Sequence, residues 1–571
     1  MLFSTFRFGD ARWGNARLAL LAALVCSLLG LGSPVSAQQP AEAVPAGLEI
    51  VTLEIAPTNI ELKNRFEYRQ LLVTGVAASG ERIDLTRTAS FAKPDDVVTL
   101  APTGLLRPKS NGSGKLTATF AGKSAEATLT VSGLDQPFHP SFVRDVMPVL
   151  AKGGCNQGTC HGGQDGKNGF KLSLRGYDPL FDHQALTDDV FGRRFNRAAP
   201  ELSLMLAKPS GDVPHEGGLT FRKEDPHYQL LFDWIADGAG LDLETTRVVG
   251  IEIVPSDPQL PRPGMQQQMA VLAKYADGSI RDVTAEAFIE TSLAEVVDVN
   301  KQGLATAVRR GEAALLARYE GAYGATTITC MGDRSGYAWV ETPEYNFIDG
   351  LVNEKLKRVK LLPSDVCTDA EFIRRVYLDL IGLPPTPEQV RAFLADGADQ
   401  RVKRDALVDR LVGSPEYVEN WTHKWADLLQ VNRKFLGEKG VWTMRGWIKK
   451  ALADNMPYDQ FVRAIVDGDG SSYTDPSAAY FKIHREPEDS VENLTQLFLG
   501  VRFNCNKCHD HPFERWTQGQ YYSLAAYFAQ IGRKPGHAVI AGTPLEGDEI
   551  VYDVNSGEVT HARTKQISPP Q

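Results

Sequence analysis

Two short strings in this sequence place a pair of cysteines just before a histidine. Near the C-terminus, Cys505, Cys508 and His509 form a C-x-x-C-H sequence. At this spacing two thiols can form thioether bonds to a porphyrin, while the adjacent histidine ligates the iron as the proximal ligand. The string therefore predicts covalently attached haem c and iron redox chemistry. A zinc site and a disulfide are the rival interpretations, because C-x-x-C serves both.

The second string, Cys155, Cys160 and His161, has two more residues between its cysteines. Such a pair in an exported protein can form a disulfide, and two cysteines with a histidine can hold zinc. We nevertheless predict a second haem c here, with His161 as proximal ligand and His215 on the opposite face of the iron. His215 stands in a Pro- and Gly-flanked loop that can approach a porphyrin closely, although it could equally be an ordinary surface histidine. Other side chains that could supply this ligand are Met205, His183 and His227.

The opposite ligand of the C-terminal haem has two candidates, His423 and His484, and either could instead be a packed core histidine. A site without a sixth ligand would bind small molecules and could catalyse, whereas two protein ligands on each iron favour electron transfer. Cys330 and Cys367 remain. A disulfide between them and two separate buried thiols are both consistent with the sequence.

Missing motifs and the net charge argue against nucleotide binding, hydrolase chemistry and nucleic-acid binding. The sequence has no Gly-rich phosphate loop, no G-x-S-x-G string and no H-E-x-x-H string. Without a leader that carries three basic residues and one acidic residue, the 61 basic and 71 acidic residues of the chain leave a net charge of −12. This charge argues against nucleic acid or an anionic membrane as partner.

The N-terminus has the features of an export signal. Arg7, Arg12 and Arg17 precede an apolar run from Leu18 to Leu31, and Val35-Ser36-Ala37 offers a small-residue cleavage site. We therefore expect residues 1–37 to be removed, although an uncleaved anchor is the alternative, and we expect no transmembrane helix in the mature chain. Thioether attachment of haem takes place outside the cytoplasm, so this signal agrees with the two motifs.

Two segments of the chain repeat one pattern of short alternating strands separated by Gly, Asn or Asp turns. We place them at residues 48–134 and 248–333, and the pattern predicts two β-sandwiches. The clearest matches are LEIAP at 53–57 with IEIVP at 251–255, and GVAASGERIDL at 75–85 with AKYADGSIRDV at 273–283. Both segments resemble bacterial Ig-like domains of group 2, which usually space or bind.

The segment between the repeats, residues 138–246, has apolar residues at helical spacing on both sides of its motif. Its strings PELSL at 200–204, PHEGG at 214–218 and DWIADG at 233–238 resemble the planctomycete cytochrome c-type domain. The resemblance implies a small all-α cytochrome c-like domain, and it supports His215 as the second ligand.

From about residue 341 the sequence becomes helical. Thr368 and Glu371 form a capping box, and Gly382 is expected to end that helix. The strings FIRRVYLD at 372–379 and CHDHPFERW at 508–516 resemble a planctomycete domain of unknown function that accompanies cytochrome domains, over residues 341–535. In that family another domain often follows, so the tail at 536–571 could be the start of a truncated one.

These observations predict a multidomain chain of two all-β Ig-like sandwiches, one small all-α cytochrome c-like domain and one mainly α C-terminal domain. The function they favour is that of an exported dihaem c-type cytochrome, which transfers electrons between redox proteins of the bacterial periplasm. One alternative is a haem-dependent oxidoreductase with an open C-terminal site. The other is an adhesion or carbohydrate-binding protein of the cell envelope, which makes surface contacts through its Ig-like domains and uses its cysteines for zinc or disulfides.

Overall fold

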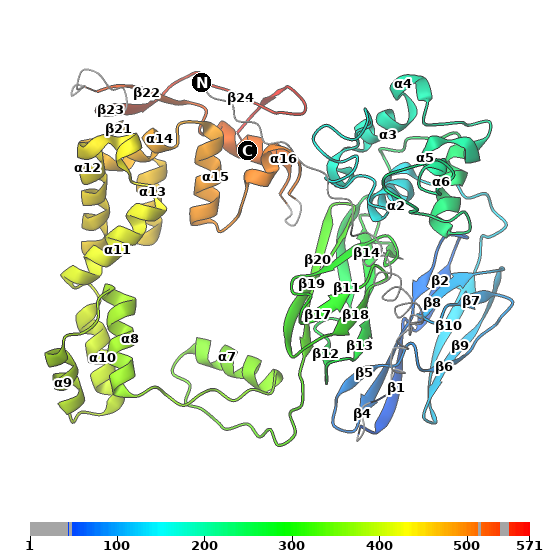
Figure 1. Ribbon diagram of the computed structural model, residues 1–571, viewed down its shortest axis with the longest axis horizontal. Helices are drawn as coiled ribbons and strands as arrows, with labels where there is room; N and C mark the ends of the chain where they lie inside the picture. The colour runs from blue at the N-terminus through cyan, green and yellow to red at the C-terminus, as the bar shows by residue number, and fades with distance from the viewer. Residues whose placement is uncertain (1–43, 45–47, 512–515, 537–546, 571) are drawn as a thin grey trace, which may run out of the picture.

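The chain is multidomain, with a β-sandwich region in its N-terminal half and a helical C-terminal domain (Figure 1). A computed structural model describes residue 44 and residues 48–511, 516–536 and 547–570. The expected leader at residues 1–37 therefore lies outside the described residues. Within the described ranges, no helix is long and apolar enough to cross a membrane.

The first β-region has three small sheets, with strand orders β1-β4-β5, β2-β10-β9-β6 and β3-β8-β7. Residues alternate along the strands, so that Leu116 and Ala118 of β9 are buried while their neighbours face outward. The strands are β1 (Ile50–Ala56), β2 (Asn59–Leu62), β3 (Arg69–Gln70), β4 (Leu72–Ala77), β5 (Arg82–Asp84), β6 (Ser90–Ala92), β7 (Val98–Leu100), β8 (Leu105–Pro108), β9 (Gly112–Phe120) and β10 (Lys123–Val131).

The second β-region repeats this arrangement, with orders β11-β14-β15, β12-β20-β19-β16 and β13-β18-β17. The two predicted β-sandwiches are therefore confirmed, each with its own apolar core. The strands are β11 (Val248–Val254), β12 (Gln259–Leu260), β13 (Gln266–Gln268), β14 (Ala270–Tyr275), β15 (Ile280–Asp282), β16 (Phe288–Thr291), β17 (Val297–Val299), β18 (Leu304–Ala307), β19 (Gly311–Tyr319) and β20 (Ala322–Cys330).

A reciprocal pair of hydrogen bonds joins the two sandwiches. The buried carboxylate of Asp84 accepts the backbone N–H of Gln268, and the buried carboxylate of Asp282 accepts that of Gln70, each at 2.6 Å. Asp84 and Asp282 occupy equivalent positions in the repeat, as do Gln70 and Gln268. The sandwiches therefore contact one another with approximate two-fold symmetry, in the manner of an isologous dimer within one chain.

Short helices fill the segment between the sandwiches. Phe142 stacks on Trp234 with ring centroids 5.1 Å apart, and both rings are buried. This contact joins the first and last helices, as their apolar spacing predicted; the likeness of the segment to cytochrome c stays a prediction. The helices are η1 (Phe142–Val146), α2 (Met147–Lys152), η2 (Leu174–Gly176), α3 (Pro179–Thr187), α4 (Asp189–Gly192), η3 (Pro200–Leu202), α5 (Leu204–Ala207) and α6 (Pro226–Ala236).

The C-terminal domain is helical up to a small sheet. The capping box of Thr368 and Glu371 is present, and Gly382 ends α8 in the left-handed conformation, as expected. The helices are α7 (Phe347–Arg358), α8 (Asp369–Ile381), α9 (Pro387–Ala395), α10 (Gln400–Leu411), α11 (Pro415–Leu428), α12 (Arg433–Ala453), α13 (Tyr458–Val466), η4 (Pro476–Ala479), α14 (Tyr480–Ile483), α15 (Pro487–Phe498), η5 (Asn504–Lys507) and α16 (Gln518–Ala526).

The tail of the chain adds strands to this helical domain. β23 pairs with β21 and β22, so residues after 536 complete a sheet that begins within the helical sequence. The strands are β21 (Gly470–Ser471), β22 (Ile531–Pro535), β23 (Glu549–Asp553), β24 (Val559–Thr560) and β25 (Ile567–Ser568). In Figure 1 this sheet lies at the end of α12 and α14.

Candidate functional site

The first motif occupies a tight loop that leaves the end of α2. The backbone N–H of Cys155 donates to the Leu150 carbonyl at 3.0 Å, and that of His161 donates to the Cys155 carbonyl at 3.0 Å. Both thiols of the motif are free. Burial, followed by the nearby Cys160, raises the pKa of the Cys155 thiol to about 12, so this sulfur is protonated at neutral pH and a poor nucleophile.

His161 and His215 face each other across this loop. Their rings are nearly parallel, at 7°, with centroids 6.2 Å apart. His161 uses Nδ1 to bond the Phe170 carbonyl at 3.1 Å, which leaves Nε2 available, and His215 Nδ1 is buried without a partner. A Cβ at Gly217 would lie 2.6 Å from the His215 ring, so this glycine permits the close approach.

A metal held by both imidazoles would need one ring nitrogen from each about 2 Å away. The structure brings these two predicted ligands close together, and their ligation of a shared metal stays a prediction. Whether haem c occupies this position stays a prediction.

The second motif lies on η5 and the turn that follows it. Cys505 is partly buried, Cys508 is exposed, and both are free thiols. His509 Nδ1 bonds the carbonyl of Asp510 at 2.6 Å. Because this backbone bond occupies one ring nitrogen, His509 has its Nε2 available.

The structure does not bring either predicted distal ligand to this motif. His423, on α11, pairs with Glu419 on the same helix at 3.4 Å, and its side chain is 67% exposed. His484 is buried against Tyr480, with ring centroids 4.6 Å apart, and burial lowers its pKa to about 4. His484 is therefore a neutral core histidine at physiological pH, which is the alternative that the sequence left open.

The other candidates of the first motif have structural partners. His183 Nε2 donates to the Ala239 carbonyl, 2.8 Å away, and its ring meets Phe142 edge-on. Met205 packs against the core of the helical segment. Cys330 is buried at the end of β20, Cys367 is half-buried, and both are free thiols.

A cleft lies between the helical segment, the second sandwich and the second motif. Its volume is about 160 Å³, and it receives residues from both motif regions. Arg175 and Tyr177 follow the first motif, whereas His509 and Asp510 belong to the second. The remaining wall comes from the second sandwich and the end of α2, with side chains that include Lys152, Arg247, Glu286, Phe288, Arg318, Glu320 and Tyr323.

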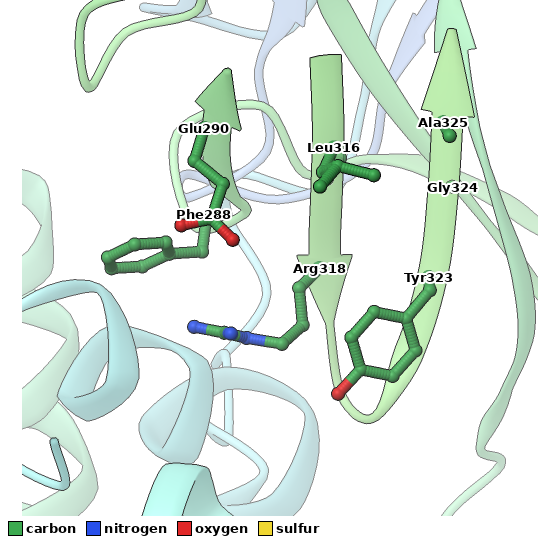
Figure 2. A pocket seen from close by; sticks show the side chains of 8 residues that line it. Phe288, Glu290, Leu316, Arg318, Tyr323, Gly324 and Ala325 are labelled. Carbon is green, nitrogen blue, oxygen red and sulfur yellow. The ribbon is translucent and has the colours of Figure 1, made fainter. Parts of the chain in front are cut away.

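One row of cross-strand neighbours, or rung, in the second sandwich lines this cleft and also lines an adjoining pocket of about 170 Å³, which Figure 2 shows. Phe288, Arg318 and Tyr323 are direct cross-strand partners on β16, β19 and β20. Figure 2 shows the Arg318 side chain extending between the two aromatic rings, and its guanidinium lies 4.8 Å from the Phe288 ring centroid. Tyr323 donates to the His511 carbonyl at 3.1 Å and so ties this sandwich to the second motif.

Glu286 connects three parts of the chain beside the cleft. Its carboxylate accepts a hydrogen bond from Tyr68 of the first sandwich and lies 3.0 Å from Nε2 of His227 on α6. Burial opposes ionisation of Glu286, but the hydrogen bond and charge of His227, with Arg281 and Tyr68, outweigh it and lower its pKa to about 2. His227 thus has a structural role rather than a ligand role.

Comparison with known proteins identifies part of the chain. Residues 347–533 match the model of a family described as PSCyt2, a protein of unknown function (DUF1549). This match confirms the planctomycete cytochrome-associated domain that the sequence predicted in this region. No curated protein matches the chain.

Some solved structures show limited similarity to this chain, and domains of a surface layer protein are among them. Domains 1-6 of the surface layer protein SbsC match at 8% identity and a TM-score of 0.14, over 52% of this chain and 29% of that one. Domains 5-6 of SbsC match at 10% identity and a TM-score of 0.22, over 50% of this chain and 99% of that one. InvD of Yersinia pseudotuberculosis matches at 12% identity and a TM-score of 0.11, over 52% and 60%.

The prediction of an exported dihaem cytochrome that transfers electrons between periplasmic proteins is wrong. Across the described ranges, no three His, Cys, Asp or Glu side chains gather closely enough to hold a metal ion, so neither motif presents an assembled donor set. The characterisation as a multihaem electron-transfer protein is wrong for the same reason, whereas covalent attachment of haem itself stays a prediction. The haem oxidoreductase alternative also needs an assembled centre.

Sequence reasoning missed the cleft residues, although the repeat contains a signal for them. In the first sandwich the equivalent rung consists of Ser90, Thr119 and Ser124, which are exposed. The second copy has two aromatic residues and an arginine in the same places. Aligning the two copies by strand register, instead of by their turns, would have shown that these three positions change from small polar residues to two aromatic residues and an arginine.

Proposed function

We propose that the protein is a cell-envelope binding protein that recognises carbohydrate through its second β-sandwich. The observation that carries this proposal is the cleft beside the rung of Phe288, Arg318 and Tyr323. Aromatic rings with a few convergent polar groups are typical of a binding site. At about 160 Å³ the cleft is smaller than a drug-sized site of roughly 300 Å³ or more, which suits one sugar of a longer chain.

The rest of the fold supports binding at an extracellular surface. The two sandwiches form one unit through the reciprocal bonds of Asp84 and Asp282, and Glu286 fixes the helical segment to both. Such a unit holds the cleft walls in place without needing a ligand. The predicted leader agrees with an exported protein.

Binding of the mature chain to a panel of immobilised oligosaccharides tests this proposal. We expect binding to at least one saccharide class, and we expect Phe288→Ser with Tyr323→Ser, which restore the residues of the first copy, to abolish it. Tyr527→Ser is the matched control, because Tyr527 is an exposed aromatic residue outside the cleft. Binding that survives the double substitution would contradict the proposal.

Covalent haem c on Cys155 and Cys160, and on Cys505 and Cys508, stays a prediction. At the first motif the His161–His215 pair supports a metal-bearing group, which would join two loops of the helical segment. A pyridine haemochrome spectrum with the intact mass of the mature chain, made in a host that attaches haem, tests both sites. Two adducts would support both, whereas none would leave these cysteines to zinc or disulfides.

A further inference from the structure

Arg318 presents a cation that the described part of the chain does not neutralise. Its guanidinium stacks on Phe288, yet among the described residues it donates no hydrogen bond and forms no ion pair. The side chain is half-buried at the cleft wall, so solvent can satisfy its donors only in part. A guanidinium with five donors and no protein acceptor is suited to an incoming anion.

A second arginine adds positive potential at the same place. The backbone N–H of Arg175 donates to the Asn156 carbonyl at 2.9 Å, which anchors this residue to the loop of the first motif. Its side chain reaches the Tyr323 hydroxyl, beside Arg318. Burial and the repulsion of Arg175 lower the pKa of Arg318, and this repulsion exceeds the attraction of Glu290.

Within the described ranges, neither of two acidic residues that line the cleft, Glu320 and Asp510, forms an ion pair with Arg318. Glu320 is buried beside Arg247, 3.6 Å away, and burial raises its pKa to about 7. Asp510 accepts the backbone N–H of Gln518 at 2.7 Å. Arg318 therefore keeps its guanidinium donors for a ligand, and the Arg175 side chain, which bonds Tyr323, adds positive charge beside it.

The repeat supports a role for this rung beyond the fold. The first sandwich builds the same strands with Ser90, Thr119 and Ser124 on the equivalent rung. An arginine is thus not needed there for a stable sandwich. Tyr323 in the second copy meets the second motif, but Arg318 gains no acceptor from that contact.

We propose that Arg318 and Arg175 bind the anionic group, carboxylate or sulfate, of an acidic saccharide whose ring lies against Phe288 and Tyr323. This inference rests on the proposed function and specifies its ligand class. The paired oxygens of a carboxylate or a sulfate match the fork of a guanidinium, and a single sugar with its anionic group is similar in size to the cleft.

Calorimetric titration of the mature chain with three probes tests the inference: trigalacturonate, a sulfated galactotriose and neutral galactotriose. We expect at least one acidic probe to bind about tenfold or more tightly than the neutral one, since a charge-assisted contact contributes that much. Arg318→Gln should remove this preference, whereas Arg318→Lys, which keeps the charge, should restore part of it. Arg309→Gln, which removes an exposed arginine paired with Glu295 in the same sandwich, should not change the preference.

The outcomes separate this inference from the proposed function. Equal affinity for acidic and neutral probes, or a preference that survives Arg318→Gln, would overturn the anionic ligand while leaving carbohydrate binding intact. Lack of binding by any saccharide would overturn both. Loss of the acidic preference in Arg318→Gln, with unchanged affinity for the neutral probe, would support both.

Discussion

Replacing Glu286 by glutamine should loosen the junction between the two sandwiches and the helical segment. The side chain of Glu286 is 9% exposed. One of its carboxylate oxygens accepts a hydrogen bond from Tyr68, and the other lies beside Nε2 of His227. Glutamine keeps the size of the side chain but has no charge. Its amide nitrogen cannot accept a hydrogen bond, so either Tyr68 or His227 would lose its acceptor. The substitution therefore tests the charge of this residue and not its volume.

The pKa shift of Glu286 gives the loss of folding free energy that we expect for Glu286→Gln. The carboxyl titrates at about 2 in the folded protein against a usual value of 4.5. A shift of this size corresponds to about 3 kcal/mol of folding free energy. Because the folded-state pKa is the lower one, this contribution is complete above pH 4.5 and is lost as the pH falls from 4.5 towards 2. Glu286→Gln should thus cost about 3 kcal/mol at pH 7 and much less near pH 2.5.

Urea unfolding at pH 7, 4.5 and 2.5, combined with hydrogen exchange of α6 and β15, measures this effect. Hydrogen exchange is needed because a multidomain chain need not unfold in one step. Glu295→Gln is the control, since Glu295 is exposed and its pair with Arg309 is worth about 0.5 kcal/mol or less. A loss at pH 7 no larger than that of the control, or a loss that persists unchanged at pH 2.5, would refute the reasoning.

Two further pairs of substitutions test other contacts. A Cβ at Gly162 would lie 2.0 Å from the Asn156 carbonyl oxygen, so Gly162→Ala should lower stability by about 1–3 kcal/mol in thermal unfolding. Gly240→Ala, which meets open space, should stay within about 0.5 kcal/mol of the parent. Asp84→Asn and Asp282→Asn should each cost about 1–3 kcal/mol in urea unfolding, and a cost at one position alone would contradict the symmetrical contact.

The fold was largely predictable because its signals are local. Alternating apolar residues and regular turns predicted both sandwiches, and the capping box of Thr368 predicted the start of α8. The contact between the sandwiches was not predictable in this way. Asp84 and Asp282 stand where a carboxylate commonly caps a turn, and each indeed accepts the backbone N–H two residues later. Only the three-dimensional arrangement adds the second bond, across more than 180 residues.

The candidate site was less predictable from the sequence than the fold. The loop that carries His215 places this residue close to His161, and its role as a ligand stays a prediction. Helical periodicity could not tell which face of α11 meets which neighbour, and His423 points to solvent. A motif indicates which chemistry its own residues can perform. Whether a further ligand from another element lies close to the motif depends on long-range packing.

The first motif has a physical connection to the cleft that does not depend on electron transfer. Its loop supplies the Asn156 carbonyl that holds Arg175, and the His161 carbonyl accepts the backbone N–H of Leu172 at 2.8 Å. The segment from residue 155 to residue 175 is therefore one hydrogen-bonded unit with His161 at one end and a cleft arginine at the other. A group held between His161 and His215 would restrain this unit and so fix the position of Arg175. If this coupling is correct, Gly162→Ala should weaken binding at the cleft as well as stability, whereas Gly240→Ala should affect neither.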